Sequence, residues 1–190
     1  MSKSESNTPL SSTTDDLISC ATLKAFKLNE NALLPTRATE DSACFDVCGF
    51  FEYGQKLKSF NSWNKEVQTP VKLIGNKPTI QLHPEHRILI PTGLIFDIPE
   101  HHVLKMYIRS SVALKQGLSL SNGTGIIDAD YVEQSYVMLT NMSESLVNII
   151  SGERLAQVEL QPVYKTALEE ITERPETKTD REGGFGSTGK

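Results

Sequence analysis

Apolar and polar residues alternate in many short runs along the central part of the chain. A period of two is typical of β-strands with one buried face. Gly, Pro, Asn and Ser separate most of these runs, and only residues 111–116 have the spacing of a helical turn. Strands are expected over residues 21–29, 42–49, 79–82, 87–96, 103–108, 117–121, 136–140, 146–150 and 155–163. The pattern predicts an all-β sandwich or barrel.

Three segments lack this alternation. Residues 1–19 contain nine Ser or Thr, and we predict a disordered N-terminal tail there. Residues 50–80 carry several aromatics among many Lys, Asn and Gln, and they are interpreted as an irregular insertion, partly packed by its aromatics. Residues 164–190 are charged, rich in turn residues and end in a glycine cluster, which predicts a C-terminal arm. The predicted β-domain therefore covers residues 20–163.

Composition narrows the class of protein. The chain has 190 residues, a net charge of −5 and a hydrophobic fraction of 38%, which suits one soluble domain with tails. It contains no apolar run of about 18 residues, so no membrane span is expected, and its polar start lacks a secretory signal. The acidic balance argues against nucleic-acid binding. Three cysteines without framework spacing predict reduced thiols in a cytoplasmic or nuclear protein.

The glycine cluster at residues 183–189 is the first candidate for chemistry. Glycines let backbone N–H groups approach an anion, and Arg181, Ser187 and Thr188 add donors suited to phosphate. Phe185, flanked by glycines, is placed to stack on a planar base. A flexible polar tail is the alternative interpretation.

Two further blocks are candidates: one offers hydrogen-bond donors suited to phosphate, and the other is a tight turn. Arg109, Ser110 and Ser111 follow an apolar strand and precede the helical turn, a step that points backbone amides outward. Residues 152–157 form a tight turn that enters the last strand. The alternatives are a surface arginine with two turn serines, and a structural turn with an Arg–Glu contact.

Residues 122–131 form the block with the most specific pattern. Asn122-Gly123 is a strong hairpin signal, and two apolar residues then lead to Asp128 and, three positions later, Tyr131. Backbone amides of such a hairpin can read the edge of a flat base, and a carboxylate beside it can activate a water. An ordinary hairpin with solvated aspartates is the alternative.

Together, the four blocks resemble the motifs of the trimeric deoxyuridine triphosphatases (dUTPases). A fifth match lies upstream, at residues 37–39 and 42–47, so that the resemblance extends from about residue 34 to 189. It implies a jelly-roll-like β-barrel, a homotrimer with three shared active sites, and hydrolysis of dUTP to dUMP and pyrophosphate. The glycine-rich arm would be mobile and close on substrate.

The resemblance also implies a role for the residues around the base and sugar. Asp128 would hold the water that attacks the α-phosphorus in line, and Tyr131 would pack against the deoxyribose. Asn122 and the backbone of Gly125, Ile126 and Ile127 would read the uracil edge.

For the triphosphate, the resemblance implies a second group of residues. Arg109, Ser110 and Ser111 would come from a neighbouring subunit, and Gln157 would reach the phosphates. Magnesium would sit on the three phosphates, with Asp46 holding it through water. In the arm, Phe185 would stack on the uracil ring. The γ-phosphate would be covered by four other arm residues, which are Arg181, Gly186, Ser187 and Thr188.

The sequence departs from the family pattern at several positions. Cys44 and Glu133 stand where the family usually has glycine, and Ile108 stands where it often has proline. The spacing between Arg181 and Gly183 is one residue shorter than the common family pattern. Two alternatives to a dUTPase stay open. One is a related dCTP deaminase or a dual activity, and the other is a non-catalytic regulatory protein whose insertion at 50–80 binds a partner protein.

Overall fold

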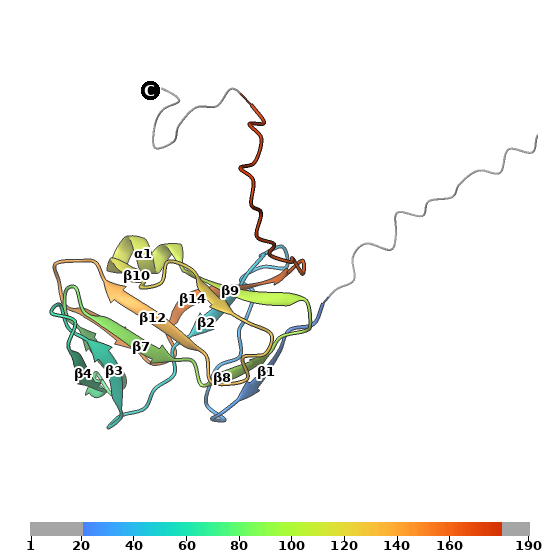
Figure 1. Cartoon of the computed structure of the whole chain (residues 1–190). Helices are drawn as coiled ribbons and strands as arrows, with labels where there is room; N and C mark the ends of the chain where they lie inside the picture. Colours follow the sequence, from blue (N-terminus) through green and yellow to red (C-terminus); the bar gives the residue numbers. More distant parts are fainter. Residues whose placement is uncertain (1–20, 180–190) are drawn as a thin grey trace, which may run out of the picture.

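The computed structural model describes residues 21–179, and this part of the chain is almost entirely β-structure (Figure 1). The predicted tail at 1–19 and the arm residues Arg181, Phe185, Gly186, Ser187 and Thr188 lie outside the described residues. The strands are β1 (Lys24–Lys27), β2 (Phe45–Cys48), β3 (Lys56–Phe60), β4 (Glu66–Pro70), β5 (Lys72–Ile74), β6 (Lys77–Leu82), β7 (Arg87–Pro91), β8 (Leu94–Asp97), β9 (His102–Ile108), β10 (Leu118–Leu120), β11 (Gly125–Ile127), β12 (Tyr136–Asn141), β13 (Val147–Ile150) and β14 (Arg154–Pro162).

Two larger sheets and two smaller ones form the barrel. The larger sheets have the strand orders β10-β12-β7-β3-β4 and β11-β9-β14-β2, and all pairings between neighbouring strands are antiparallel. The smaller sheets are β1-β8 and β13-β6-β5. The predicted all-β, jelly-roll-like barrel is confirmed, and the edge strands β10 and β11 are short, with three residues each.

One hydrophobic core lies between the two larger sheets. Alternate residues of each strand point inward, such as Ile90 of β7, Leu139 of β12, Leu104 of β9 and Val158 of β14, and all four are fully buried. Because the period of a strand is two, the intervening residues face outward. The outward faces therefore carry most of the polar side chains.

The irregular structure predicted for residues 50–80 is wrong, because these residues form β3, β4, β5 and most of β6. β3 pairs with both β4 and β7, so it is an integral strand of the five-stranded sheet. Its inward positions are Leu57 and Ser59, and the Ser59 hydroxyl donates to the Val67 carbonyl at 3.0 Å. A buried serine and an outward Phe60 hide the alternation in the sequence.

The aromatics of this segment pack only in part. Phe51 is buried in the core, whereas Tyr53 and Trp63 are exposed. The expected packing therefore holds at the start of the segment and fails beyond it. The fold of the segment depends instead on the pairing of β3 with β7.

A single helix is found among the described residues. α1 (Ser110–Gln116) buries Val112 and ends at Gly117, which has the left-handed φ of 65° that a glycine adopts without strain. This confirms the predicted helical turn. With seven residues, the only helix in the range 21–179 is far too short to span a membrane.

The arm leaves the barrel after β14. The Val163 N–H donates to the His101 carbonyl at 2.7 Å, and from there to residue 179 the chain forms no strand or helix. Figure 1 shows this segment extending away from the barrel. Its side chains are exposed throughout.

Candidate functional site

A pocket of about 340 Å³ lies where the two larger sheets separate at their edges. β10 is the edge strand of one sheet and β11 is the edge strand of the other, and the turn at Asn122-Gly123 joins them. The pocket is lined by Leu89, Met106, Leu120, Asn122, Gly125, Ile126, Ile127, Tyr131, Ser135, Tyr136 and Met138. The structure thus brings together all five predicted base- and sugar-reading residues.

The Asn122-Gly123 turn is present, but the hairpin predicted around it is not. Gly123 has a φ of 71°, and its N–H donates to the Leu120 carbonyl at 3.1 Å. β10 then pairs with β12 and β11 with β9, rather than with each other. The backbone edges that an ordinary hairpin would pair are therefore left open beside the pocket.

Gly125 is held close to the neighbouring strand. A Cβ atom added at this position would lie 3.0 Å from the Cβ of Met106, which is tighter than most side chains tolerate. Glycine therefore lets β11 lie flat against β9 at the pocket wall. The free edge of β11 can then present its backbone donors and acceptors to a ligand.

Two tyrosines tie down the loop that forms the outer side of the pocket. The Tyr131 hydroxyl donates to the Gln134 carbonyl at 3.0 Å, and the Gln134 side-chain amide donates to the Tyr136 hydroxyl at 2.7 Å. The Tyr131 N–H donates to the Asp128 carbonyl at 3.1 Å. The Tyr131 ring is thus held at the pocket, whereas Asp128, which directly follows the pocket residue Ile127, is exposed and is not among the residues that line the pocket.

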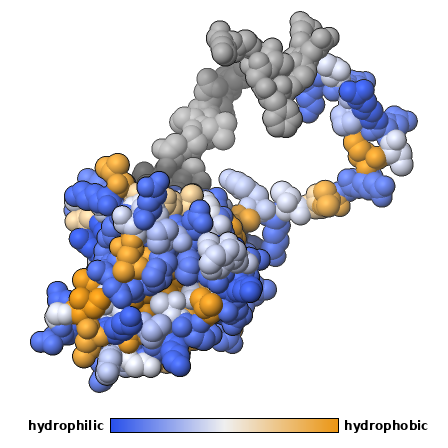
Figure 2. Space-filling view, turned by 90° about the vertical axis from the view of Figure 1, so that its left-hand side faces the viewer, coloured by the Kyte–Doolittle hydropathy of each residue, from blue (hydrophilic) through white to orange (hydrophobic). Residues whose placement is uncertain are grey.

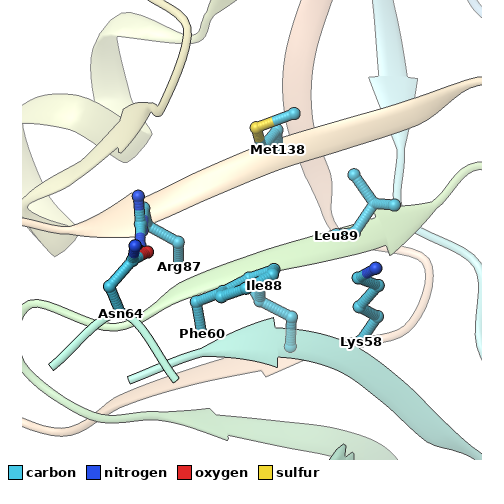
Figure 3. Close-up of a pocket in the computed structure, with 7 residues that line it drawn as sticks. All are labelled: Lys58, Phe60, Asn64, Arg87, Ile88, Leu89 and Met138. Carbon is cyan, nitrogen blue, oxygen red and sulfur yellow. The ribbon is translucent and has the colours of Figure 1, made fainter. Parts of the chain in front are cut away.

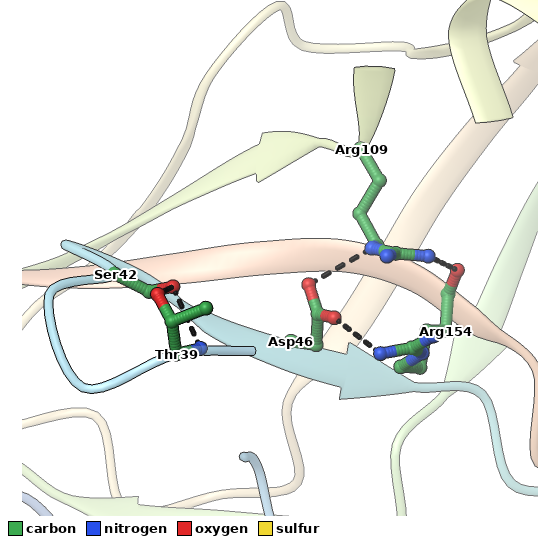
Figure 4. A network of polar contacts seen from close by, with 5 residues as sticks. All are labelled: Thr39, Ser42, Asp46, Arg109 and Arg154. Atoms are coloured by element: carbon green, nitrogen blue, oxygen red, sulfur yellow. Dashed lines mark hydrogen bonds and ion pairs between the residues drawn. The ribbon is translucent and has the colours of Figure 1, made fainter. Parts of the chain in front are cut away.

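A cluster of charges forms a second part of the candidate site (Figure 4). Asp46 is buried on β2, and its Oδ1 accepts from Arg109 Nε at 2.8 Å, while its Oδ2 accepts from Arg154 Nη1 at 3.0 Å. Arg109 Nη1 also donates to the Arg154 carbonyl at 3.3 Å. Gln157 is the cross-strand neighbour of Asp46 on β14. One carboxylate between two guanidinium groups leaves a net positive charge there.

The loop before β2 supports this cluster. Thr36 and Asp46 exchange two backbone hydrogen bonds, of 3.3 and 2.8 Å. The Thr39 N–H donates to the Ser42 hydroxyl at 3.1 Å, which closes the turn between them. These contacts fix the backbone at Asp46, so its carboxylate has a defined position under the arginines.

Arg154 was not among the predicted site residues. Sequence reasoning placed it in a structural turn with an Arg–Glu contact, but its partner is Asp46, and Glu153 accepts instead from the Gln116 amide. A register shift between Arg154 and Ala156 turns the arginine toward β2. That shift is a tertiary feature, so only the pairing of β14 with β2 could have revealed this contact.

The described side chains do not form a direct magnesium site. Both oxygens of Asp46 already accept from arginines, and within residues 21–179 no group of three His, Cys, Asp or Glu side chains could hold a metal ion. The prediction that Asp46 meets magnesium through water stays a prediction.

The thiols near this cluster are free. Cys44 and Cys48 flank Asp46 without a disulfide, as expected for reduced cysteines. Burial raises the pKa of the Cys48 thiol, and the nearby Arg154 opposes this rise. Burial and the Glu159 carboxylate likewise raise the pKa of Cys44. Raised values keep both thiols protonated, so neither is an activated nucleophile.

The pocket and the charge cluster lie apart within one copy of the chain. Ile127 at the pocket pairs with Leu104, and Arg109 follows five residues later along β9. At about 3.3 Å per residue, Arg109 is roughly 16 Å along the strand from Leu104, and roughly 10 Å from Met106, which also lines the pocket. Asp46 lies farther still, on the opposite edge of the sheet from β11. Ser110 and Ser111, exposed at the start of α1, lie at the Arg109 end.

Comparison with known proteins gives a consistent result. A sequence model of the dUTPase family matches residues 74–189. A deoxyuridine 5'-triphosphate nucleotidohydrolase of Nautilia profundicola is 32% identical over 88% of this chain and 99% of its own length. That of Rhizobium johnstonii is 42% identical over 58% of this chain and 70% of its own length.

Solved structures show the same fold. A mutant dUTPase of Staphylococcus bacteriophage 80alpha, with dUpNHpp, has a TM-score of 0.66 at 22% identity over 88% of this chain and 98% of its own. A mutant dUTPase of phage phi11 of S. aureus, studied for the coordination of a structural Mg(II) ion, has a TM-score of 0.61 at 22% identity. That match covers 82% of this chain and 99% of the phage chain.

Proposed function

The chain belongs to the dUTPase family, and from this premise we propose that it hydrolyses dUTP to dUMP and pyrophosphate. The observation that carries the proposal is the pocket between β10 and β11. It gathers Asn122, the Gly125–Ile127 strand edge and Tyr131, and the exposed Asp128 directly follows Ile127 in the chain.

Uracil would be read by the open edge of β11. An edge strand has unpaired backbone N–H and C=O groups, which match the alternating donors and acceptors of a pyrimidine edge. The Asn122 amide lines the same pocket and adds a further donor and acceptor. A base with an added methyl group would meet the narrow wall where Gly125 lies against Met106. Thymine would therefore fit poorly.

Asp128 would act as the general base. Its side chain is exposed next to the pocket residue Ile127, and no described residue forms an ion pair or a hydrogen bond with its carboxylate, so the carboxylate is free to orient a water. A positioned carboxylate can take the proton as the water attacks the α-phosphorus. The Tyr131 ring, held through Gln134, would pack against the sugar and exclude a 2′-hydroxyl.

The phosphates would be bound by Arg109, Ser110, Ser111 and Gln157 of a second copy. In one copy Arg109 lies five residues beyond Leu104, the β9 partner of Ile127, and this separation from the neighbouring Asp128 supports a site shared between two copies. A homotrimer with shared sites would join the pocket of one copy to the charge cluster of the next. The arm residues Arg181, Phe185, Gly186, Ser187 and Thr188 would close over the bound nucleotide and exclude water.

The test is a side-by-side assay of dUTP, dCTP and dTTP, with and without Mg²⁺. We expect pyrophosphate release from dUTP far above that from the other two, increased by Mg²⁺. Ammonia release from dCTP would instead assign a deaminase. Absence of any turnover in a folded oligomer would leave the non-catalytic alternative.

A further inference from the structure

Two of the four histidines of the chain lie side by side on the turn between β6 and β7. The ring centres of His83 and His86 are 5.4 Å apart, and the two ring planes are inclined by 47°. Both rings line a small pocket of about 200 Å³, whose polar lining also includes Gln68, Thr69, Lys72 and Gln81. We propose that this pocket binds one divalent transition-metal ion, such as Zn²⁺, through the two imidazoles. The proposal does not depend on the hydrolysis of dUTP.

The spacing of the two rings suits a shared metal ion. With metal–nitrogen bonds of about 2.1 Å and a tetrahedral angle between them, two coordinated imidazoles have ring centres roughly 5 Å apart. The separation of the His83 and His86 rings is 5.4 Å. The terminal torsion of a histidine side chain is broad, so each ring can turn one nitrogen toward a common point without any backbone movement. Imidazole is a preferred ligand of Zn²⁺, Cu²⁺ and Ni²⁺.

The turn that carries both histidines is held by Asn141, a buried residue of β12. The Asn141 N–H donates to the His86 carbonyl at 3.1 Å, and the Asn141 carbonyl accepts from the Glu85 N–H at 2.8 Å. The Asn141 side-chain amide donates to the Leu82 carbonyl at 3.0 Å. The His86 N–H also donates to the His83 carbonyl at 3.2 Å, which closes the turn. A backbone that is already fixed lowers the entropy cost of ordering the two ligands around an ion.

The other walls of the pocket supply groups for the rest of the coordination sphere. Gln68 and Thr69 belong to β4, and Gln81 belongs to β6. An ion held by two imidazoles keeps water in its remaining positions, and side-chain amides and hydroxyls can hydrogen-bond those waters. β4 is the edge strand of the five-stranded sheet, whereas β6 belongs to the three-stranded sheet. The bound ion would therefore tie the two sheets together where they meet.

The surface around β4 is in keeping with an ionic ligand. Figure 1 places β4 on the side of the barrel that Figure 2 faces. Figure 2 shows hydrophilic residues there, with separate hydrophobic groups among them. A polar recess in such a surface suits a hydrated ion better than an apolar ligand, which needs mostly apolar walls.

Two cationic side chains stand close to the histidines. Arg87 directly follows His86, but its guanidinium bonds to the Asn64 side chain and lies 5.6 Å from the centre of the Phe60 ring. Figure 3 shows it in this neighbouring cleft, which has a volume of about 260 Å³.

Lys72 is the cation that lines the histidine pocket, and its ammonium donates to the Gln81 side chain at 3.3 Å. Because Lys72 is exposed, its flexible stem lets the ammonium turn into water when an ion binds. Its charge still opposes a bound cation. The sign of the effect of Lys72 on binding therefore reports the charge of the ligand.

The experiment is a calorimetric titration of chelator-treated, full-length protein with Zn²⁺ at pH 7.5, where imidazole is mostly neutral and can bind a metal. All samples carry serine at Cys20, Cys44 and Cys48, so that no thiol competes for the ion. We expect one saturable Zn²⁺ site per chain. His83→Gln and His86→Gln should each weaken binding at least tenfold, since even groups that only support a metal ligand contribute about 10–100-fold.

The matched control is His101→Asn with His102→Asn. It removes the other two imidazoles of the chain and should leave the affinity for Zn²⁺ unchanged. Thermal unfolding gives a second measurement, because an ion that binds only the folded chain raises its Tm. Zn²⁺ should raise the Tm of the parent protein and of this control, and it should not raise that of His83→Gln. Unfolding in EDTA shows that each variant is folded.

A charge substitution then separates a cation site from an anion site. Lys72→Glu removes the opposing charge and adds a carboxylate, so it should tighten Zn²⁺ binding severalfold, a gain that misfolding does not produce. Lys77→Glu makes the same change at an exposed position of β6 that does not line the pocket, and it should bind Zn²⁺ as the parent protein does.

Three results would overturn the proposal. The first is equal affinity for Zn²⁺ in the parent protein and in His83→Gln. The second is Zn²⁺ binding that Lys72→Glu leaves unchanged or weakens. The third is binding of inorganic phosphate that Lys72→Glu abolishes, in a protein that takes up no Zn²⁺, which would assign the pocket to an anion.

Discussion

Asp46 and Arg109, which are 63 residues apart in the chain, form a buried ion pair with an Oδ1–Nε distance of 2.8 Å. The second oxygen of the same carboxylate binds Arg154 at 3.0 Å. Neither arginine is free to swing, because each is tied to Asp46. Asp46 thus orients the Arg109 guanidinium, which the proposed function assigns to phosphate binding.

Replacing Asp46 with asparagine should therefore weaken both the fold and the binding of dUTP. We expect the free energy of unfolding to fall by about 1–3 kcal/mol, because charged hydrogen-bond partners are lost at a buried position. The KM for dUTP should rise roughly tenfold, since charge-assisted bonds to phosphate are worth about 1.5–3 kcal/mol. Denaturant unfolding and steady-state kinetics measure the two effects.

The matched control is Asp97→Asn, which breaks the exposed pair with Lys24. Exposed pairs contribute at most about 1 kcal/mol, so this variant should match the parent protein in stability and in kinetics. Equal effects of the two substitutions would show that Asp46 has no positioning role.

Replacing Asp128 with asparagine should abolish most turnover and leave the fold intact. The Asp128 side chain is exposed and forms no ion pair among the described residues, so its loss costs no packing. Loss of a general base lowers the rate by about 10²–10⁴-fold. Single-turnover kinetics and nucleotide binding are measured together, and Asp130→Asn, a neighbouring exposed carboxylate, is the control. Full activity in the Asp128 variant would remove the proposed role.

Deleting residues 180–190 should spare assembly and remove most turnover. The barrel core and its strand pairings lie wholly within residues 21–163, so the oligomer should form without the deleted segment. Closure over the nucleotide would be lost, and kcat should fall more than the affinity for dUTP. Light scattering and kinetics measure the two properties. An unchanged kcat would contradict a closing role for the arm.

Acid should destabilise the protein partly through His86. Burial, and then the charge of His83, lowers the pKa of His86 below its usual value. A depressed histidine pKa means that the unfolded chain binds the proton more readily, so stability is complete above about pH 6.5 and is lost as the pH falls below it. The His86→Gln variant should lose less stability between pH 7.5 and 5.5 than the parent protein.

Thermal unfolding at the two pH values measures this effect. The control is His101→Asn, at an exposed position whose φ of 61° asparagine tolerates. The control should keep the acid sensitivity of the parent chain. Identical pH slopes for the parent protein and His86→Gln would exclude a contribution from His86.

Much of the fold and of the site follows from local order in the chain. Alternation marks the strands, since a strand exposes every second residue whatever it packs against. The block from Asn122 to Tyr131 is contiguous, so its residues stay together once β11 and its turn form. These features require few long-range contacts and were predicted correctly, apart from the hairpin pairing of β10 with β11.

The remaining features depend on pairings between distant segments. β3 looks irregular in sequence because Ser59 is buried through a hydrogen bond to Val67, and only pairing with β7 makes it a central strand. Arg154 reaches Asp46 only because β14 pairs with β2 and shifts register there. Local order thus decides which residues of the 122–131 block come together at the pocket, whereas long-range strand register decides which charges meet. The reason is that the position of a residue within its own strand decides which face of the sheet its side chain points to. The residue that it contacts across the sheet depends instead on the register of the neighbouring strand.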